Sequence, residues 1–245
     1  MSPNLRRVAV SSWQKSGAHR SAILRGKEIE VIPHSFPVEL YRATDKLADG
    51  KLHVVMAAAR LDDPVKDLPA AVEALNILYY EHPEIAARVH VDFVGGLRDT
   101  SLLKALKVEH SVHGTVSTGR LRELYGQAAV VLSSSKYETM GATLMEGMAA
   151  GAIPATYGDA GQADIVTDAK NGFIAPVHTP AALSFALQMA LLTADEVLQM
   201  AREGDEQGLV SKEEVAGFTP EALHRSVAER FAPEVIARRY TEWSA

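Results

Sequence analysis

The fold assignment rests on the segment Lys136-Tyr-Glu-Thr-Met-Gly-Ala-Thr-Leu-Met-Glu-Gly-Met-Ala-Ala-Gly-Ala-Ile-Pro154. Just before it, Ala129-Val-Val-Leu132 is an uninterrupted apolar run, typical of a parallel strand buried on both faces. A helix is expected to begin near Gly141. Glu138 then lies in the connecting loop and Glu146 just over one turn inside the helix. Both carboxylates can therefore face one ligand at the C-terminal edge of the sheet, where open α/β sheets bind ligands.

The rest of the chain alternates predicted strands and helices in units of about 30 residues, which indicates an α/β fold with a doubly wound, Rossmann-like parallel sheet. Strands are predicted at residues 8–10, 28–33, 52–58, 89–94, 129–132, 152–156 and 173–175, with a short strand or turn at 112–116. Helices are predicted at residues 13–24, 68–80, 100–107, around 121–125, 180–192, 194–203, 220–231 and 233–243. Residues 34–51 are interpreted as a linker and residues 204–217 as a mobile surface loop.

Composition excludes several classes of protein. The formal charge of -6 and the pI near 5.9 argue against a general nucleic-acid binder, whose surface would be basic. The chain has no cysteine, so disulfides and thiolate metal sites are excluded, and a reducing cytosol is compatible with it. No apolar run approaches the ~18 to 20 residues of a membrane span, and the apolar core of the first residues is too short for a signal peptide.

Several polar groups are expected at the same sheet edge, and each has a plain alternative. Arg60 and Lys66 bracket a strand-to-helix loop and could grip a diphosphate, or could be solvated cations paired with neighbouring aspartates. The glycine-containing helix start near Gly141 could bind an anion through its amides, or be an ordinary helix entry. Glu138 and Glu146 could contact sugar and ribose hydroxyls, or be unrelated surface residues. The histidines lack metal-ligand spacing, so no metal is assigned.

Four landmarks in order resemble the C-terminal, donor-binding domain of a retaining glycosyltransferase of family 4, the group 1 type with two facing Rossmann-like domains (GT-B). The resemblance covers roughly residues 31–245. The landmarks are Arg60-Leu-Asp-Asp-Pro-Val-Lys66, the segment 134–154 with Glu, seven residues and Glu, Gly158-Asp-Ala-Gly-Gln-Ala-Asp-Ile-Val166, and Asn171-Gly-Phe-Ile174. Two departures concern the second landmark. Met140 stands where phenylalanine is common, and Gly147 stands where alanine is common.

The resemblance implies a nucleoside diphosphate sugar, UDP- or GDP-linked, as donor substrate, with no cofactor and no required metal. It implies that Arg60 and Lys66 clamp the diphosphate and that Glu138 addresses the sugar. Glu146 would contact the nucleoside ribose. Two further groups complete the implied donor site. Beside the base lie Gly114, Thr115 and Val116, and at the helix start lie Met140, Gly141, Ala142, Thr143 and Leu144.

The resemblance also implies a division of labour within a larger enzyme. Residues 1–35 would be the remnant of an N-terminal domain and its crossover linker, residues 36–232 the donor domain, and residues 233–245 a helix that packs back on the missing domain. The glycan or lipid acceptor would bind that missing domain. We expect a cytoplasmic protein, at most peripherally associated with the inner face of the membrane, with a homodimer as one way to cover the final helix.

Three functions remain open from sequence. The first is the donor-binding part of a hexosyltransferase serving cell-surface polysaccharide or glycolipid assembly. The second is a nucleotide-sugar-binding module that performs no transfer alone. The third is an epimerase relative acting on a UDP-sugar, which has no support from the paired glutamates.

Overall fold

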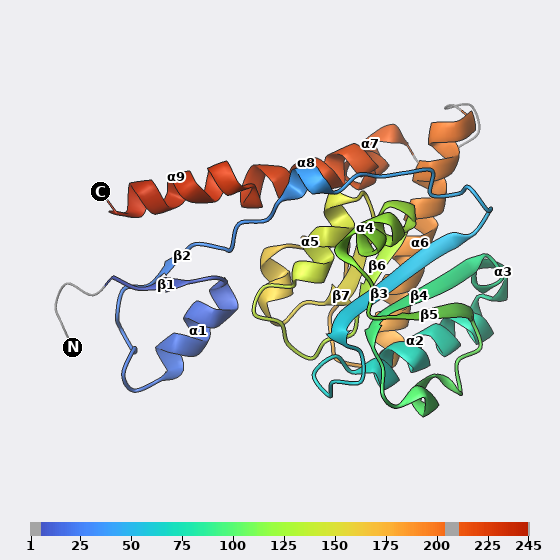
Figure 1. Ribbon diagram of the computed structural model, residues 1–245, viewed down its shortest axis with the longest axis horizontal. Helices are drawn as coiled ribbons and strands as arrows, with labels where there is room; N and C mark the ends of the chain where they lie inside the picture. The colour runs from blue at the N-terminus through green and yellow to red at the C-terminus, as the bar shows by residue number, and fades with distance from the viewer. Residues whose placement is uncertain (1–5, 204–210, 245) are drawn as a thin grey trace.

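The computed structural model describes residues 6–203 and 211–244, and shows a sheet domain with an N-terminal segment set beside it (Figure 1). The main sheet has six parallel strands in the order β5-β4-β3-β6-β7-β8. Its strands are β3 (Leu52–Arg60), β4 (Val89–Gly96), β5 (Glu109–Gly114), β6 (Val130–Ser133), β7 (Ile153–Tyr157) and β8 (Phe173–Ala175). The predicted doubly wound α/β fold is confirmed.

Helices cover both faces of this sheet. Their bounds are α2 (Leu68–Glu81), α3 (Pro83–Ala86), α4 (Thr118–Gln127), α5 (Ala142–Ala149), α6 (Pro180–Glu203), α7 (Lys212–Val215), α8 (Pro220–Phe231) and α9 (Pro233–Ser244). In Figure 1, α2 and α6 lie on one side of the strands, and α4 and α5 on the other. Side-chain caps fix two of the starts, because Ser117 accepts from the Arg120 amide and Thr219 accepts from the Ala222 amide.

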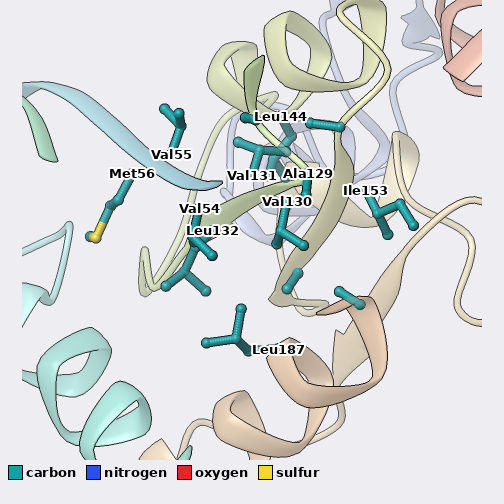
Figure 2. Close-up of a cluster of buried hydrophobic side chains, with 14 of the residues drawn as sticks. Val54, Val55, Met56, Ala129, Val130, Val131, Leu132, Leu144, Ile153 and Leu187 are labelled. Atoms are coloured by element: carbon teal, nitrogen blue, oxygen red, sulfur yellow. The ribbon is translucent and has the colours of Figure 1, made fainter. Parts of the chain in front are cut away.

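The core forms where the central strands meet the helices. Val54 and Val55 of β3 and residues 130–132 of β6 are buried, and Figure 2 shows them beside Leu144 of α5 and Leu187 of α6. Unbroken runs of valine and leucine suit strands that are covered on both faces. The strand pair β3 and β6 is therefore fixed at the centre of the domain.

The N-terminal segment holds a two-stranded parallel sheet, β1 (Val8–Ala9) with β2 (Glu30–Val31), and helix α1 (Ser12–Arg20). Ser11 caps α1, and the helix ends earlier than the predicted residue 24. The final helix α9 leaves the sheet domain and runs along β2 in Figure 1. The Arg239 guanidinium of α9 donates to the carbonyl of Val31 in β2.

Three predicted elements were wrong. Residues 100–107 contain only a short 3-10 helix (Thr100–Leu103), which the Asp99 side chain caps. Residues 180–203 form one helix, α6, instead of two. Within residues 204–217, α7 and the start of a 3-10 helix (Ala216–Phe218) replace the predicted loop, while residues 204–210 lie outside the described residues. The linker at 34–51 carries a 3-10 turn (Val38–Leu40).

Over Pro180–Arg202, α6 is long and apolar enough to cross a membrane, which the apolar runs of the sequence did not indicate. Its apolar residues have another explanation in the fold. The helix packs against α2, β7 and β8, and Leu183, Leu187 and Leu191 are fully buried there. Covering one face of the sheet requires this apolar stripe.

Candidate functional site

The strand order places the reversal of the chain between β3 and β6. Strands β4 and β5 extend the sheet on one side of β3, and β7 and β8 extend it on the other side of β6. A crevice opens outside the carboxyl ends of the strands at such a switch point, and ligands bind there in open α/β sheets. Arg60 ends β3 at this edge, and the loop after β6 leads to Glu138.

Lys66 and Glu138 come from the loops that follow these two strands, and they meet. The distance from Lys66 Nζ to Glu138 Oε1 is 2.5 Å, and both side chains are largely buried. The hydroxyl of Ser135 also donates to Glu138 Oε1, at 2.8 Å. Two further hydrogen bonds join the same loops: Ser134 Oγ donates to the Lys66 carbonyl at 2.6 Å, and the Lys136 amide donates to the Val65 carbonyl at 2.9 Å. Lys66 is therefore part of the site and does not pair with an aspartate of its own loop.

Arg60, unlike Lys66, pairs with an aspartate of its own loop. Its Nε donates to Asp62 Oδ1 at 3.3 Å, while about half of the Arg60 side chain remains exposed. Asp62 also accepts the backbone amide of Arg98, and this hydrogen bond, together with Arg60, lowers the pKa of Asp62. Arg60 thus stands at the rim of the same edge, with its guanidinium accessible from solvent.

The start of α5 needs glycine at its N-cap. Gly141 has φ 90 and ψ 53, in the left-handed region, and the helix begins at Ala142 as the sequence predicts. Gly161 braces the preceding loop, because its amide donates to the Glu138 carbonyl at 2.8 Å. A Cβ on Gly161 would lie 2.1 Å from the Thr139 carbonyl oxygen, so only glycine allows this approach. The first amides of α5 are therefore held beside Glu138, where a helix N-terminus favours an anion.

A cavity of about 230 Å³ opens beside α5. It is lined by residues of β3, β4, α4 and α5 and of the loop after β5, namely Ala57, Ala58, Ala59, Val94, Gly95, Thr115, Val116, Leu121, Thr143 and Glu146. Gly95 lets the wall close tightly, since a Cβ there would lie 1.7 Å from the Ala58 carbonyl oxygen. The cavity joins an apolar surface to one carboxylate, which suits a nucleoside with a flat base and ribose hydroxyls.

Glu146 is the one acid in the cavity wall, and tyrosines surround it. The Tyr41 hydroxyl donates to Glu146 Oε1 at 3.1 Å. Tyr125 of α4 is fully buried, and its hydroxyl interacts with Glu146 without a hydrogen-bond partner at normal geometry. Burial raises the pKa of Glu146, while Tyr125, Tyr41 and Arg122 oppose that rise. The two hydroxyls and one cation therefore oppose the protonation that burial favours.

The predicted site residues fall into two adjoining groups and one outlier. Thr115, Val116, Thr143 and Glu146 line the cavity, with Gly114 ending β5 at φ 64 just before them. Arg60, Lys66, Glu138, Gly141 and Ala142 lie along the loop edge, and Met140 is buried beneath it. Leu144 is the outlier, because it is buried in the core and its amide donates to the Gly141 carbonyl.

Sequence reasoning missed Tyr41, Tyr125, Arg122 and Ser135. Tyr41 sits in a linker without periodicity, and Tyr125 was interpreted as an apolar helix position. Neither pattern carries a signal for contact with Glu146. Among the described residues, no group of three histidine, aspartate or glutamate side chains could hold a metal ion.

The sequence around this site matches a known protein family. The model of the family described as glycosyl transferases group 1 matches residues 43–207. That span runs from before β3 to the end of α6 and includes both loops and the cavity. The chain belongs to the group 1 glycosyl transferases. A search of curated protein sequences gives no match.

Solved structures share the fold of this group 1 chain at low identity. A glycosyltransferase from Rickettsia africae ESF-5 superposes with a TM-score of 0.73 at 18% identity, covering 97% of this chain and 62% of the other. Sucrose-phosphate synthase from Thermosynechococcus elongatus gives 0.71 at 18%, covering 97% and 57%. Anabaena HepE, in complex with UDP and glucose, gives 0.66 at 18%, covering 96% and 61%. The group 1 chain thus spans 57% to 62% of the length of these three structures.

Proposed function

We propose that this chain is the donor nucleotide-sugar-binding part of a retaining, family 4 hexosyltransferase that transfers a sugar from a nucleoside diphosphate to a glycan or lipid acceptor. The observation that carries the proposal is the meeting of Lys66 and Glu138 at 2.5 Å, beside the start of α5 and the cavity that holds Glu146. A cation, a helix start and a cavity with one carboxylate supply the contacts that the parts of a nucleotide sugar need.

Each part of the donor is assigned a contact in this proposal. The base lies against Thr115 and Val116 and the ribose hydroxyls donate to Glu146. The diphosphate lies over the first amides of α5, between Arg60 and Lys66. These assignments agree with the chemistry of each group, because a guanidinium binds phosphate bidentately and a lysine supplies a mobile point charge.

Charge stabilisation is the mechanism that these residues support. The leaving nucleoside diphosphate gains negative charge as the glycosidic bond breaks. Fixed donors aimed at that charge lower the barrier most directly, and Arg60, Lys66 and the α5 amides are such donors. Glu138 orients Lys66 through their direct contact and offsets positive charge that develops on the sugar. Retention of configuration belongs to the proposal through the family 4 assignment alone.

UDP is the first donor nucleotide to test, because Anabaena HepE is described in complex with UDP and glucose. Calorimetric titration with UDP, GDP and ADP would measure binding to the chain and to the double variant Arg60→Ala/Lys66→Ala. We expect binding of one nucleotide, weakened at least tenfold by the double variant. A charge-matched control, Lys104→Ala/Arg202→Ala, removes two exposed cations elsewhere and should bind as the wild type does. No binding of any nucleotide, or equal loss in both double variants, would contradict the proposal.

We also propose that a separate N-terminal domain binds the acceptor. Residues 1–35 would belong to that domain and residues 36–232 to the donor domain. Residues 233–245 would form a helix that packs back on the N-terminal domain. The course of α9 along β2 supports this division. Cytoplasmic location, with at most peripheral membrane association, is proposed on the same assignment.

The second candidate is a nucleotide-sugar-binding module that transfers nothing on its own. It is favoured by coverage, since the chain spans only 57% to 62% of three solved glycosyltransferase-fold structures. Release of nucleoside diphosphate from a nucleotide sugar in the presence of glycan or lipid acceptors separates the two candidates. The transferase predicts acceptor-dependent release, and the module predicts binding without release.

A further inference from the structure

Two tyrosines from distant parts of the chain converge on the carboxylate of Glu146. Tyr41 lies in the segment before β3, is 4% exposed, and donates to Glu146 Oε1 at 3.1 Å. Tyr125 lies on α4 and is 0% exposed, and its hydroxyl has no hydrogen-bond partner. Neither tyrosine lines the nucleoside cavity, so both act on it through Glu146.

The arrangement around Tyr41 and Tyr125 is rigid. The Tyr41 ring packs against Phe36 with centroids 5.0 Å apart and against Tyr125 at 6.4 Å. The Arg122 guanidinium lies 5.5 Å from the Tyr41 ring centroid. Below them, the buried ammonium of Lys46 donates to the carbonyls of Gly126, Ala128 and Ala150 at the ends of α4 and α5. The hydroxyls are therefore fixed relative to the helix that carries Glu146.

Tyr125 acts on the same carboxylate from α4. Its hydroxyl has no partner at hydrogen-bond geometry, and Glu146 is the charged group that acts on it.

We propose that Tyr41 and Tyr125 are positioning residues for donor binding, which aim the Glu146 carboxylate at the ribose hydroxyls and oppose its protonation. This inference rests on the proposed nucleotide-sugar function. An ionised carboxylate only accepts hydrogen bonds and has about four acceptor positions. Tyr41 takes one on Oε1, and the others remain for the two hydroxyls of a ribose. A protonated Glu146 would lose acceptor capacity at the atom that the ribose needs.

Electrostatics support the same assignment. Burial raises the pKa of Glu146, whereas Tyr125, Tyr41 and Arg122 oppose the rise. Within the described part of the chain, these three are the titratable or charged side chains that act on Glu146, from the linker and from α4. Burial, together with Glu146, raises the pKa of Tyr41 to about 12, so that Tyr41 stays a donor across the working pH range. Loss of either hydroxyl moves the pKa of Glu146 upward.

UDP affinity measured by calorimetry from pH 5 to pH 8 tests this proposal on the 245-residue chain. The variants are Tyr41→Phe, Tyr125→Phe and Glu146→Gln, with Tyr79→Phe on α2 as a control for removal of a tyrosine hydroxyl elsewhere. The diphosphate also titrates in this range, and Glu146→Gln reports that contribution alone. Wild-type affinity should fall at low pH more steeply than in Glu146→Gln.

The two phenylalanine variants should move that fall to higher pH, so that they bind UDP several-fold more weakly than the wild type near the midpoint. In a Glu146→Gln background, Tyr41→Phe should cause no further change, because its effect acts through the carboxylate. The pKa of Glu146, read from its carboxyl carbon by NMR, should rise in both variants without ligand.

The outcomes separate this inference from the proposed function. If the wild type binds no nucleotide, both are wrong. If UDP binds and Arg60→Ala/Lys66→Ala weakens it, but neither phenylalanine variant shifts the pH profile or the pKa of Glu146, the positioning role alone is wrong. If Tyr41→Phe weakens binding equally in the presence and absence of the Glu146 carboxylate, the tyrosine acts on packing and the inference is overturned.

Discussion

Gly147 tests whether the α5 helix must lie against β6 as closely as the structure has it. A Cβ at this position would lie 2.6 Å from Cβ and Cγ1 of Val131 and 3.0 Å from its Cγ2. Val131 is fully buried in β6 and packs in the core drawn in Figure 2. Gly147→Ala should gain about 1 kcal/mol in helix propensity. Overpacking of this severity costs about 3 kcal/mol, the upper end of the usual range. The net expectation is a loss of about 2 kcal/mol.

Urea denaturation followed by circular dichroism measures this loss, with an unchanged m-value as the sign that the unfolded state is unaffected. Val131→Ala provides the matched test, because it removes Cγ1 and Cγ2, two of the three atoms that the new methyl group meets, and leaves Cβ. The double variant should be more stable than the sum of the two single losses predicts, and the difference is their coupling. A Gly147→Ala protein as stable as the wild type would refute this account of the helix position. It would also remove our explanation for glycine where alanine is common.

Three further predictions concern groups outside the cavity. Lys46→Met should lower the unfolding free energy by about 2 kcal/mol in urea titrations, because buried carbonyls lose their donor; equal stability would contradict this. The pKa of His53 is raised mainly by its hydrogen bond to Asp92, so its stabilisation is complete below about pH 6.5 and is lost as pH rises through the raised pKa. His53→Gln should flatten that decline in thermal melts from pH 5 to 8, and an unchanged profile would count against it. Asp164 accepts the Ser12 amide at 2.6 Å, so Asp164→Ala should speed tryptic cleavage after Lys15 without moving the unfolding midpoint, whereas unchanged cleavage would contradict this role.

The sheet was predictable because each central strand is marked by an apolar run in its own sequence. The runs at 52–58, 89–94 and 129–132 are apolar enough to be covered on both faces, and each became a strand with nearly the predicted bounds. Helix α8 was predicted with its observed bounds, because Thr219 precedes Pro220 in the N-cap and first-turn positions. Such signals involve residues close in sequence, so they do not depend on tertiary packing.

The errors arose where tertiary packing outweighs local signals. The break expected near residue 193 does not occur, because both halves of α6 cover one continuous surface of the sheet and α2. The helix expected at 100–107 shortens to one 3-10 turn, in which Leu103 is buried, and Leu106 is buried separately after the turn ends. A periodic pattern cannot reveal which of these arrangements the neighbouring elements require.

The site was predictable in its residues but not in its contacts. The strand-to-helix loops identify Arg60, Lys66 and Glu138 as groups at one edge, and the strand order brings their loops together. The direct contact of Lys66 with Glu138 spans 72 positions, so spacing gives no sign of it. The tyrosine contact to Glu146 spans 105 positions, from a linker that has no periodic pattern.

A crystal structure of the chain with UDP tests the central claim most directly. The account predicts uridine in the cavity beside Thr115 and Val116, with the ribose hydroxyls within hydrogen-bond distance of Glu146. The diphosphate should lie between Lys66 and the first amides of α5. UDP bound at another surface, or seated in the cavity with its ribose turned away from Glu146, would contradict the claim.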